Sequence, residues 1–156
     1  MVARLGSHHL PFGSEIAGNV YALNVLEHLD DLPAAVAEIW RVLAPGGRCE
    51  IEVPYFASVS AHTDPTHRRT FAYGTFEHFT APAMAGWQAN RHTWFGGAQG
   101  PARFCILARR LRFGRAHRLL GIEALANRWP AAYENLFAYW FPARALEVVL
   151  SKSAAS

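Results

Sequence analysis

Apolar residues form an almost continuous run at residues 20–26 (VYALNVL). Such a run is typical of a parallel strand that is buried on both faces. Further along, apolar side chains recur at helical spacing and predict one buried helix face: Leu32, Val36, Ile39, Trp40 and Leu43. Residues 48–53 then alternate apolar and polar side chains, as a second strand does. A strand, a crossover helix and a parallel strand form a right-handed βαβ unit, so the pattern predicts an open α/β sheet with a βαβ core at residues 10–56.

The predicted helix has its own start and stop signals. Glu27, Asp30 and Asp31 place negative charge near its start, where the helix dipole favours it. Pro33 fits the first turn, because the N–H that a proline lacks would have no helical partner there. The sequence Pro45-Gly46-Gly47 predicts the end of the helix.

The remaining segments have less regular patterns. Residues 57–80 are predicted to form an active-site type of loop, rich in small residues and histidines, and then a short helix at 70–79. This loop follows the carboxyl end of a strand, where open α/β sheets bind their ligands. Residues 81–152 are predicted to complete the sheet and add a helical cap, with a strand at 143–151 and helices at 117–129 and 131–140. Residues 91–95 and 103–111 are predicted to form either two strands or one strand with a long approach. Residues 153–156 form the expected tail, with fraying from Lys152 onward.

Composition narrows the class of protein. The chain has 156 residues, half of them hydrophobic, which fits one folded domain. No apolar run approaches the ~18 residues that a membrane span needs. The first residues (MVARLGSHHLPFG) lack the apolar core of a signal peptide. Cys49 and Cys105 lack the spacing of metal ligands and are expected to be buried thiols. Together these features predict a cytoplasmic protein.

Charge is unevenly distributed along the chain. Residues 1–88 hold five Lys or Arg against nine acidic side chains, whereas residues 89–156 hold ten against three. The densest basic segment is residues 103–118, with six arginines. Such a segment attracts phosphates, nucleic acid or anionic lipid in some proteins. A solvated arginine-rich face is the simpler interpretation, because the net charge is only +3.

Two motifs stand at a specific separation: VLEHL at residues 25–29 and RVLAPGG at residues 41–47. With the LPF at residues 10–12 and the VPY at residues 53–55, they resemble the middle of class I S-adenosylmethionine-dependent methyltransferases. The sequence DPTHRRTFAYGTF (residues 64–76) is similar to a loop and helix of one large branch of that family. Residues 133–152 resemble the C-terminal region of the same branch.

The resemblance implies part of a Rossmann-like sheet with flanking helices. The family has seven strands in the order 3-2-1-4-5-7-6, the last of them antiparallel, and this chain matches strands 4, 5, 7 and 6. Strands 1–3 and the glycine-rich GxGxG cofactor loop have no match before residue 19. The expected molecule is therefore a truncated methyltransferase-like domain over residues 1–152. Its residues 19–25 would form an exposed edge that pairs with a second copy or with a missing N-terminal segment.

The resemblance also implies roles for the end of the first strand. S-adenosylmethionine is the implied cofactor, and its binding residues here would be Asn24, Val25, Leu26 and Glu27. His28 would act as a general base near the methyl acceptor, since imidazole titrates near neutral pH. The alternatives are that Glu27 caps a helix and that His28 is a hydrogen-bonded structural residue.

The histidine-rich loop supplies the other candidate residues. The resemblance implies that Asp64 and His67 order the substrate side and act as catalytic residues. Tyr55, His62 and Arg68 are the remaining substrate-side candidates. Arg68 would orient an anionic substrate, or it is simply solvated.

A metal site is a rival interpretation of the same loop. His62, Asp64 and His67 form the pattern HxDxxH, and two imidazoles with a carboxylate suit a divalent ion. The sequence at 64–66 is equally ordinary turn chemistry. With no fourth ligand evident, we expect no metal.

The predicted activity is transfer of a methyl group from S-adenosylmethionine to an unidentified O, N or C acceptor. The cofactor site is incomplete, so the resemblance does not imply that this chain is active on its own. The alternative is a non-catalytic methyltransferase-like remnant or binding module, whose basic C-terminal half docks an acidic partner.

Overall fold

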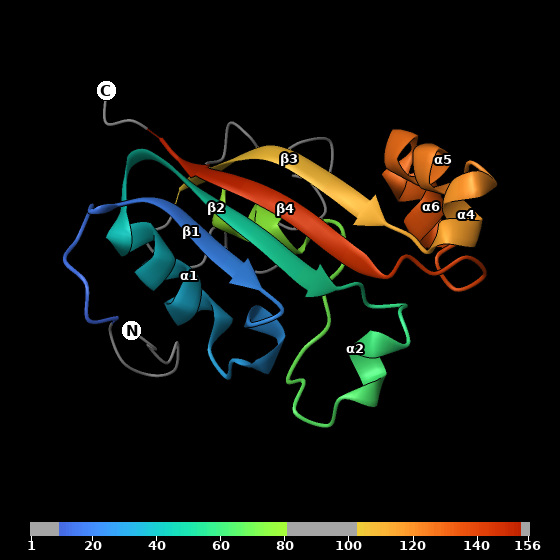
Figure 1. Cartoon of the computed structure of the whole chain (residues 1–156), viewed down its shortest axis with the longest axis horizontal. Helices are drawn as coiled ribbons and strands as arrows, with labels where there is room; N and C mark the ends of the chain where they lie inside the picture. Colours follow the sequence, from blue (N-terminus) through green and yellow to red (C-terminus); the bar gives the residue numbers. More distant parts are fainter. Residues whose placement is uncertain (1–9, 81–102, 154–156) are drawn as a thin grey trace.

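A mixed four-stranded sheet forms the centre of the molecule (Figure 1). The structure, a computed structural model, describes residues 10–80 and 103–153. The sheet has the order β1-β2-β4-β3, with β1 parallel to β2 and β4 antiparallel to both of its neighbours. Its strands are β1 (Ala17–Leu23), β2 (Leu43–Pro54), β3 (Phe104–Arg112) and β4 (Ala145–Lys152). This arrangement is the one expected for strands 4-5-7-6, so the predicted fold class is confirmed.

The first strand, the helix and the second strand form the predicted βαβ unit. A short 3-10 turn, η1 (Leu26–His28), precedes α1 (Leu32–Val42). The side chain of Asp31 caps α1, because its Oδ1 accepts a hydrogen bond from the amide of Ala34 at 2.8 Å. Pro33 lies in the first turn, as predicted.

The prediction that Pro45-Gly46-Gly47 ends the helix is wrong. The helix ends at Val42, and β2 begins with the next residue. The glycines lie instead in an irregularity of the β1–β2 pairing, where Ala17 pairs with Leu43 and Asn19 already pairs with Arg48. Gly46 has φ 77°, and a Cβ on Gly47 would lie 2.8 Å from a backbone oxygen. Both positions therefore need glycine for the bulge rather than for a helix cap.

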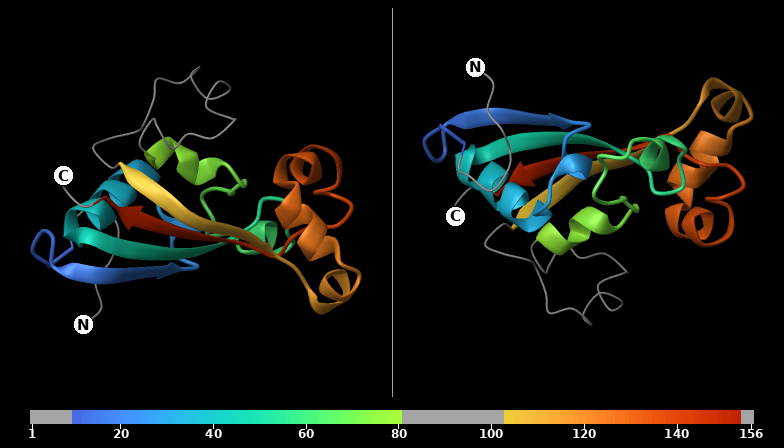
Figure 2. Two further views of the ribbon diagram at one scale, coloured as in Figure 1. Left: turned by 90° about the horizontal axis from the view of Figure 1, so that it is seen from above. Right: turned by 90° about the horizontal axis from the view of Figure 1, so that it is seen from below.

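One face of the sheet is covered by α1 and by η2 (Thr75–Phe79), as Figure 2 shows. Val36 and Ile39 of α1 are buried against this face, together with three phenylalanines that are fully buried: Phe71, Phe76 and Phe104. The short helix predicted at 70–79 is thus confirmed in its second half, as a 3-10 helix.

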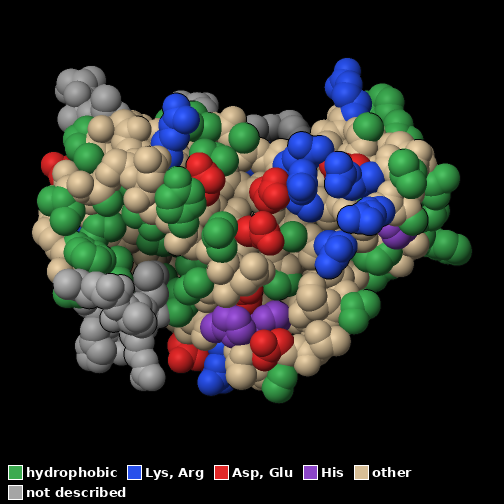
Figure 3. Space-filling model, in the orientation of Figure 1, with side chains coloured by type: hydrophobic (Ala, Val, Ile, Leu, Met, Phe, Trp, Pro, Cys, Tyr) green, Lys and Arg blue, Asp and Glu red, His purple; other side chains and the backbone are tan. Residues whose placement is uncertain are grey.

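The opposite face carries no helix in the described part of the chain (Figure 2). Tyr21 and Leu23 lie on it with 62% and 52% of their surface exposed. Across the strands, Leu23 pairs with Glu52 and Glu52 pairs with Glu147. Figure 3 shows this face, where acidic side chains lie near the middle and most of the Lys and Arg side chains gather on the right. The expectation that residues 20–26 form a strand buried on both faces is therefore wrong for this face, because no described element covers it.

The C-terminal helices form a cap beyond the end of β3 (Figure 1). They are α4 (Arg115–Leu119), α5 (Ile122–Arg128) and α6 (Pro130–Leu136), which confirms the predicted helical cap with shorter helices. Asn127 fixes α5 to β3 through two hydrogen bonds, from the Leu111 amide and to the Leu111 carbonyl. The strand predicted at residues 91–95 lies outside the described residues. Among the described helices, none is long and apolar enough to cross a membrane.

The arginines of residues 103–118 pair with acidic side chains of the same chain. Arg109 lies 2.6 Å from Glu77, Arg112 lies 3.2 Å from Glu147, and Arg110 bonds to Glu123. Much of the positive charge in this segment is therefore neutralised locally.

The prediction that the chain is already frayed at Lys152 is wrong, whereas residues 154–156 lie outside the described part of the chain. Lys152 is the last residue of β4 and is 7% exposed. Its ammonium donates hydrogen bonds to the carbonyl oxygens of Trp40 and Leu43, both at 2.9 Å, and to Glu15 at 3.1 Å. The lysine therefore satisfies carbonyls at the C-terminal end of α1.

Candidate functional site

The site lies where the carboxyl ends of β1 and β2 meet. Adjacent parallel strands end on the same side of a sheet, and open α/β sheets bind their ligands there. After β1 the chain turns through Asn24, whose φ of 51° lies in the left-handed region that asparagine tolerates, and enters η1. After β2 it forms α2 (Ser60–Thr63) and the loop to Phe71. The two segments are joined by the Arg68 amide, which donates to the Glu27 carbonyl at 2.7 Å.

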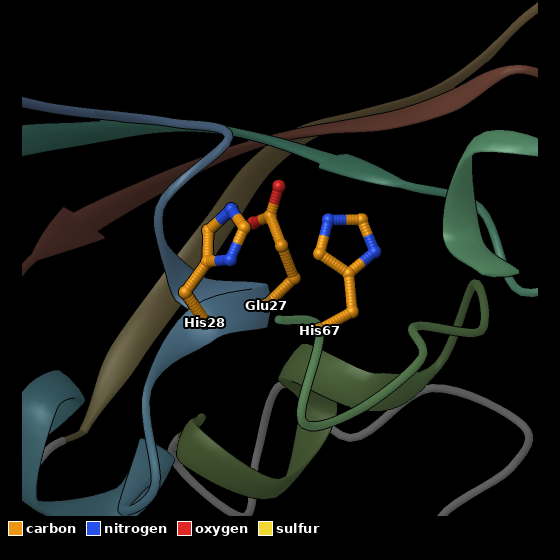
Figure 4. A group of neighbouring side chains, drawn as sticks. All are labelled: Glu27, His28 and His67. Carbon is orange, nitrogen blue, oxygen red and sulfur yellow. The ribbon is translucent and has the colours of Figure 1, made fainter. Parts of the chain in front are cut away.

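Three side chains from these segments form one group, here called the Glu27–His28–His67 cluster (Figure 4). Each offers one nitrogen or oxygen atom, and these atoms lie within 4.8 Å of one another. The two imidazole rings meet edge to face, with their centroids 4.8 Å apart. The sequence predicts all three residues for the site, and the structure brings them together.

Glu27 is the buried member of the cluster. It is 1% exposed, and its Oε2 atom has no hydrogen-bond partner. A buried oxygen without a partner costs on the order of 1–3 kcal/mol, and more when it is charged. Glu27 does not cap α1, because Asp31 does. The capping alternative is therefore wrong for this helix, and the carboxylate is left available for the site.

His28 is oriented by a chain of hydrogen bonds. The Thr66 hydroxyl donates to Asp64 Oδ1 at 2.6 Å, and the same hydroxyl oxygen lies 2.9 Å from His28 Nδ1. A threonine hydroxyl has one hydrogen, so the contact with His28 requires that Nδ1–H of the ring is the donor. The network thus assigns the proton of neutral His28 to Nδ1 and leaves a lone pair on Nε2.

A backbone carbonyl fixes the proton of His67 on Nδ1, as Thr66 does for His28. Its Nδ1 lies 3.2 Å from the carbonyl oxygen of Ala61, which can only accept, so Nδ1 carries the proton. The other nitrogen, Nε2, is 3.9 Å from Asp64 Oδ2. In their neutral forms both imidazoles therefore keep an unprotonated Nε2.

Asp64 is the carboxylate that supports both histidines. Hydrogen bonds from the hydroxyl and then the amide of Thr66 hold the pKa of Asp64 below its usual value. Coulombic interactions with His67 and then with His28 lower this pKa further. Asp64 is thus ionised at neutral pH and accepts hydrogen bonds, so its place in the site is to orient Thr66.

The other candidates lie around this cluster without joining it. The ring Nε2 of His62 contacts the Phe56 carbonyl at 2.9 Å. Arg68 is exposed and lies 3.3 Å from Asp30. Tyr55 is fully buried, and its hydroxyl donates to Glu134 at 3.2 Å. Burial raises the pKa of Tyr55 far above its usual value, with the nearby Glu134 carboxylate adding to the effect.

The candidate cofactor segment is divided between core and solvent. Leu26 is fully buried, so only its backbone is available, whereas Val25 is 37% exposed. Asn24 is exposed, and its amide donates to the Glu52 carbonyl at 2.8 Å. The side chain of Asn24, which is exposed, and the buried carboxylate of Glu27 are the polar side chains of this segment.

Sequence reasoning missed Thr66. The sequence at 64–66 reads as a turn, and the turn is present, with the Thr66 amide donating to Asp64 at 2.8 Å. Nothing in the sequence shows that the hydroxyl also reaches His28, which is 38 residues away.

Comparisons with known proteins agree with this architecture. Residues 2–51 match the family model of a methyltransferase domain. A search of curated protein sequences gives no match. Residues 2–51 include β1, α1, most of β2, and η1, which carries Glu27 and His28.

Solved structures of similar fold are longer than this chain. A SAM-dependent methyltransferase from Archaeoglobus fulgidus aligns with a TM-score of 0.52 at 14% identity, over 90% of this chain and 62% of that one. The [4+2]-cyclase SpnF aligns with a TM-score of 0.51 at 20% identity, over 94% and 53%. A SAM-dependent methyltransferase from Mesorhizobium loti aligns with a TM-score of 0.49 at 15% identity, over 96% and 67%.

The chain thus spans between about half and two thirds of the length of the solved structures that it matches. It is similar to class I S-adenosylmethionine-dependent methyltransferases, in sequence over residues 2–51 and in its Rossmann-like fold over the described residues.

Proposed function

We propose that this chain is the part of a SAM-dependent methyltransferase that binds the methyl acceptor and one side of the cofactor. The observation that carries the proposal is the position of the Glu27–His28–His67 cluster. It lies at the carboxyl ends of two parallel strands, and two of its residues, Glu27 and His28, lie in the segment that matches a methyltransferase domain. This is the place where an open α/β sheet exposes a ligand to side chains from two loops.

In this proposal the residues after β1 face the cofactor. The exposed side-chain amide of Asn24 and the backbone at Val25 and Leu26 would contact the methionine part of S-adenosylmethionine. These proposed contacts are supported by the anchoring of this segment. The backbone N–H of Asn24 is bonded to β2, and the Leu26 side chain is fully buried. A fixed segment can position a sulfonium methyl group without paying to order itself first.

The two histidines would serve the acceptor. Methyl transfer forms a bond from the acceptor O, N or C atom to the methyl carbon, and the sulfonium keeps the electron pair as it leaves as a thioether. Where the acceptor loses a proton, a nearby base takes it. His28 and His67 each present an unprotonated Nε2, and Asp64 orients them through Thr66 and through its own carboxylate.

Tyr55, His62 and Arg68 would lie on the substrate side, and their contacts suit this role to different degrees. Arg68 is exposed and next to the cluster in sequence, which suits contact with an anionic acceptor. His62 is held by the Phe56 carbonyl at the other end of the loop. Tyr55 is buried against Glu134, so it would act by holding the loop rather than by touching the acceptor.

We further propose that the open edge of β1 is paired in the active assembly. Within residues 10–80 and 103–153, β1 is an end strand of the sheet and has β2 as its strand neighbour. An edge with exposed Tyr21 and Leu23 invites a further strand, from a second copy or from another segment. Such a strand would complete the side of the site that faces away from β2.

The fold alone does not determine the reaction. One of the similar structures is named a [4+2]-cyclase, so this architecture hosts a second kind of chemistry. The rival function is a binding module that uses the basic C-terminal half. Because Arg109, Arg110 and Arg112 already pair with acids of the chain, that rival has less free charge to use than the sequence indicates.

Calorimetry with S-adenosylmethionine and with its demethylated product tests the proposal. A saturable heat is expected, and Asn24→Ala should weaken it. Asn135→Ala is the matched control, because Asn135 is exposed on α6 and bonds to a carbonyl of its own helix. If no heat is measured at millimolar ligand, this chain does not bind the cofactor. If the assembled protein transfers labelled methyl to none of the acceptors tested, the proposed activity is rejected.

A further inference from the structure

We infer that the Glu27–His28–His67 cluster binds one divalent transition-metal ion. The cluster brings together one carboxylate and two imidazoles from η1 and from the loop after β2 (Figure 4). It differs from the HxDxxH set that the sequence indicates, since it contains Glu27 and His28 in place of His62 and Asp64. The inference stands on the donor atoms and holds whether or not the chain transfers a methyl group. With the ion bound, the Nε2 lone pairs of His28 and His67 are used in coordination, so the base proposed above acts only in the ion-free chain.

The donor set has the chemistry of a transition-metal site. Two imidazole nitrogens with one carboxylate oxygen suit Zn²⁺, Fe²⁺ and Co²⁺, whereas Ca²⁺ and Mg²⁺ prefer oxygen alone. Three protein ligands leave positions open for water or for an acceptor oxygen. His28 and His67 are partly exposed, so an ion can reach the cluster from solvent.

The protonation of the rings is already that of ligands. A metal-bound imidazole uses the lone pair of one nitrogen and donates a hydrogen bond from the other. His67 donates from Nδ1 to the Ala61 carbonyl, and His28 donates from Nδ1 to the Thr66 hydroxyl. Both Nε2 atoms are therefore free to coordinate, and each ring has the second-shell partner that fixes its orientation.

The unpartnered oxygen of Glu27 is the observation that points to a cation. Glu27 is 1% exposed, yet its Oε2 has no hydrogen-bond donor in reach. Buried carboxylates are normally paired with donors, with cations or with metal ions. The ligand atoms lie within 4.8 Å of one another, so a modest contraction of the cluster brings them to a shared ion.

The HxDxxH set does not offer a comparable site. His62 uses its Nε2 on the Phe56 carbonyl, and Asp64 uses Oδ1 on both the hydroxyl and the amide of Thr66. Asp64 thus acts on the cluster indirectly: it accepts from the Thr66 hydroxyl, which in turn holds His28. The structure assigns His67 alone, of the three HxDxxH residues, to the ion.

The test uses the untagged full chain after treatment with a chelator. Co²⁺ is titrated while visible absorption is recorded, and Zn²⁺ is then added as a competitor. One Co²⁺ per chain is expected, with absorption bands typical of nitrogen and oxygen ligands that disappear as Zn²⁺ displaces it. Glu27→Gln and His67→Gln should each weaken binding at least as much as the loss of a second-shell partner, on the order of 10–100-fold.

His62→Gln is the matched control, because it removes a histidine of the same loop that lies outside the cluster. Its affinity for Co²⁺ should equal that of the wild-type chain. A measurement on the wild type avoids any folding defect of the variants: Zn²⁺ should shift the ring ¹⁵N signals of His28 and His67 and leave those of His62 unchanged.

Two results would overturn the inference. One is that the chelator-treated chain binds neither Co²⁺ nor Zn²⁺. The other is that His62→Gln weakens binding as strongly as His67→Gln while Glu27→Gln binds normally. Because the readout is metal occupancy, a chain that binds metal but not S-adenosylmethionine would refute the proposed function and leave this inference standing.

Discussion

Thr66 Oγ1 lies 2.9 Å from Nδ1 of His28, although the two residues are 38 positions apart in the chain. The hydroxyl gives its own hydrogen to Asp64, so it can only accept from the ring. This contact selects the tautomer of His28 and so decides which nitrogen the site presents. It also ties the loop after β2 to the turn after β1, and the properties of His28 therefore depend on a residue outside the VLEHL motif.

Removing the Thr66 hydroxyl should release His28. In Thr66→Val the ring loses the partner that fixes Nδ1–H, and the Nε2–H tautomer becomes accessible. We expect Co²⁺ affinity to fall on the order of tenfold, as for other second-shell partners. Ring ¹⁵N spectra of the metal-free chain should show a mixture of His28 tautomers. Thr66→Ser keeps a hydroxyl and should restore both properties, and an unchanged spectrum in Thr66→Val would show that the contact does not select the tautomer.

The open edge of β1 should make the chain associate. The backbone N–H of Asn24 points to β2. Because backbone N–H groups alternate in direction along a strand, those of Tyr21 and Leu23 point away from β2. Tyr21 and Leu23 also expose their side chains. We expect concentration-dependent dimers in sedimentation experiments, and we expect the double substitution to lysine at these positions to shift the chain to monomer by charging the edge.

Arg48→Lys is a suitable control for that experiment, because Arg48 is exposed on β2 and keeps its charge. A wild-type chain that stays monomeric and well folded at high concentration would contradict the proposed pairing of β1.

The strand order could be predicted because two kinds of information agree. The apolar run at residues 20–26 and the alternation at 48–53 each define a strand, and the motif spacing identifies which strands they are. The site could be predicted in part for the same reason, since Glu27, His28 and His67 follow the carboxyl ends of strands or lie in the next loop. What connects them could not, because Thr66 has the sequence context of an ordinary turn.

The errors also have physical causes. A Pro-Gly-Gly sequence suits a helix end and a strand bulge equally well, since both need a positive φ or a close backbone approach. At Gly47 a Cβ would meet the Ala44 oxygen at 2.8 Å and the Ala17 oxygen at 3.0 Å, and the second of these belongs to the preceding strand and is invisible in the local sequence. Lys152 reads as tail because lysine is rarely buried, and the carbonyls that hold it belong to a helix 109 residues or more away.

Cys49 should be unreactive and should make stability fall at high pH. Burial raises the pKa of its thiol from 9.0 to about 12, with the charge of Glu50 adding to the effect. In the unfolded chain the thiol ionises near pH 9, so with rising pH ionisation stabilises the unfolded state before it stabilises the folded state. The contribution of Cys49 is complete below pH 9 and is lost as the pH rises from 9 to 12.

Two measurements check this expectation. Alkylation of the folded chain should modify Cys105, which is partly exposed, well before Cys49. In Cys49→Ala the free energy of unfolding should decline less steeply between pH 9 and 12 than in the wild type. Equal labelling of both thiols at pH 8 would contradict the burial of Cys49.

Lys152→Met should destabilise the sheet–helix contact. The substitution keeps a long side chain but removes the donor for the Trp40 and Leu43 carbonyls and the partner of Glu15. Hydrogen bonds from a charged donor contribute about 1.5–3 kcal/mol each, and the carbonyls left behind are near the buried end of α1, so we expect a loss of about 2–4 kcal/mol in unfolding by urea. The ammonium also lies 5.1 Å from the Trp40 ring, so the fluorescence of that tryptophan should change in the folded state.

Glu15→Gln separates the parts of this interaction. Glu15 is largely exposed, so its charge contributes little, on the order of 0–1 kcal/mol for an exposed pair. The stability of Glu15→Gln should therefore stay close to that of the wild type while Lys152→Met falls well below it. If the two variants lost equal stability, the ion pair rather than the α1 carbonyls would be what holds Lys152, and the C-terminal capping of α1 by β4 would be wrong.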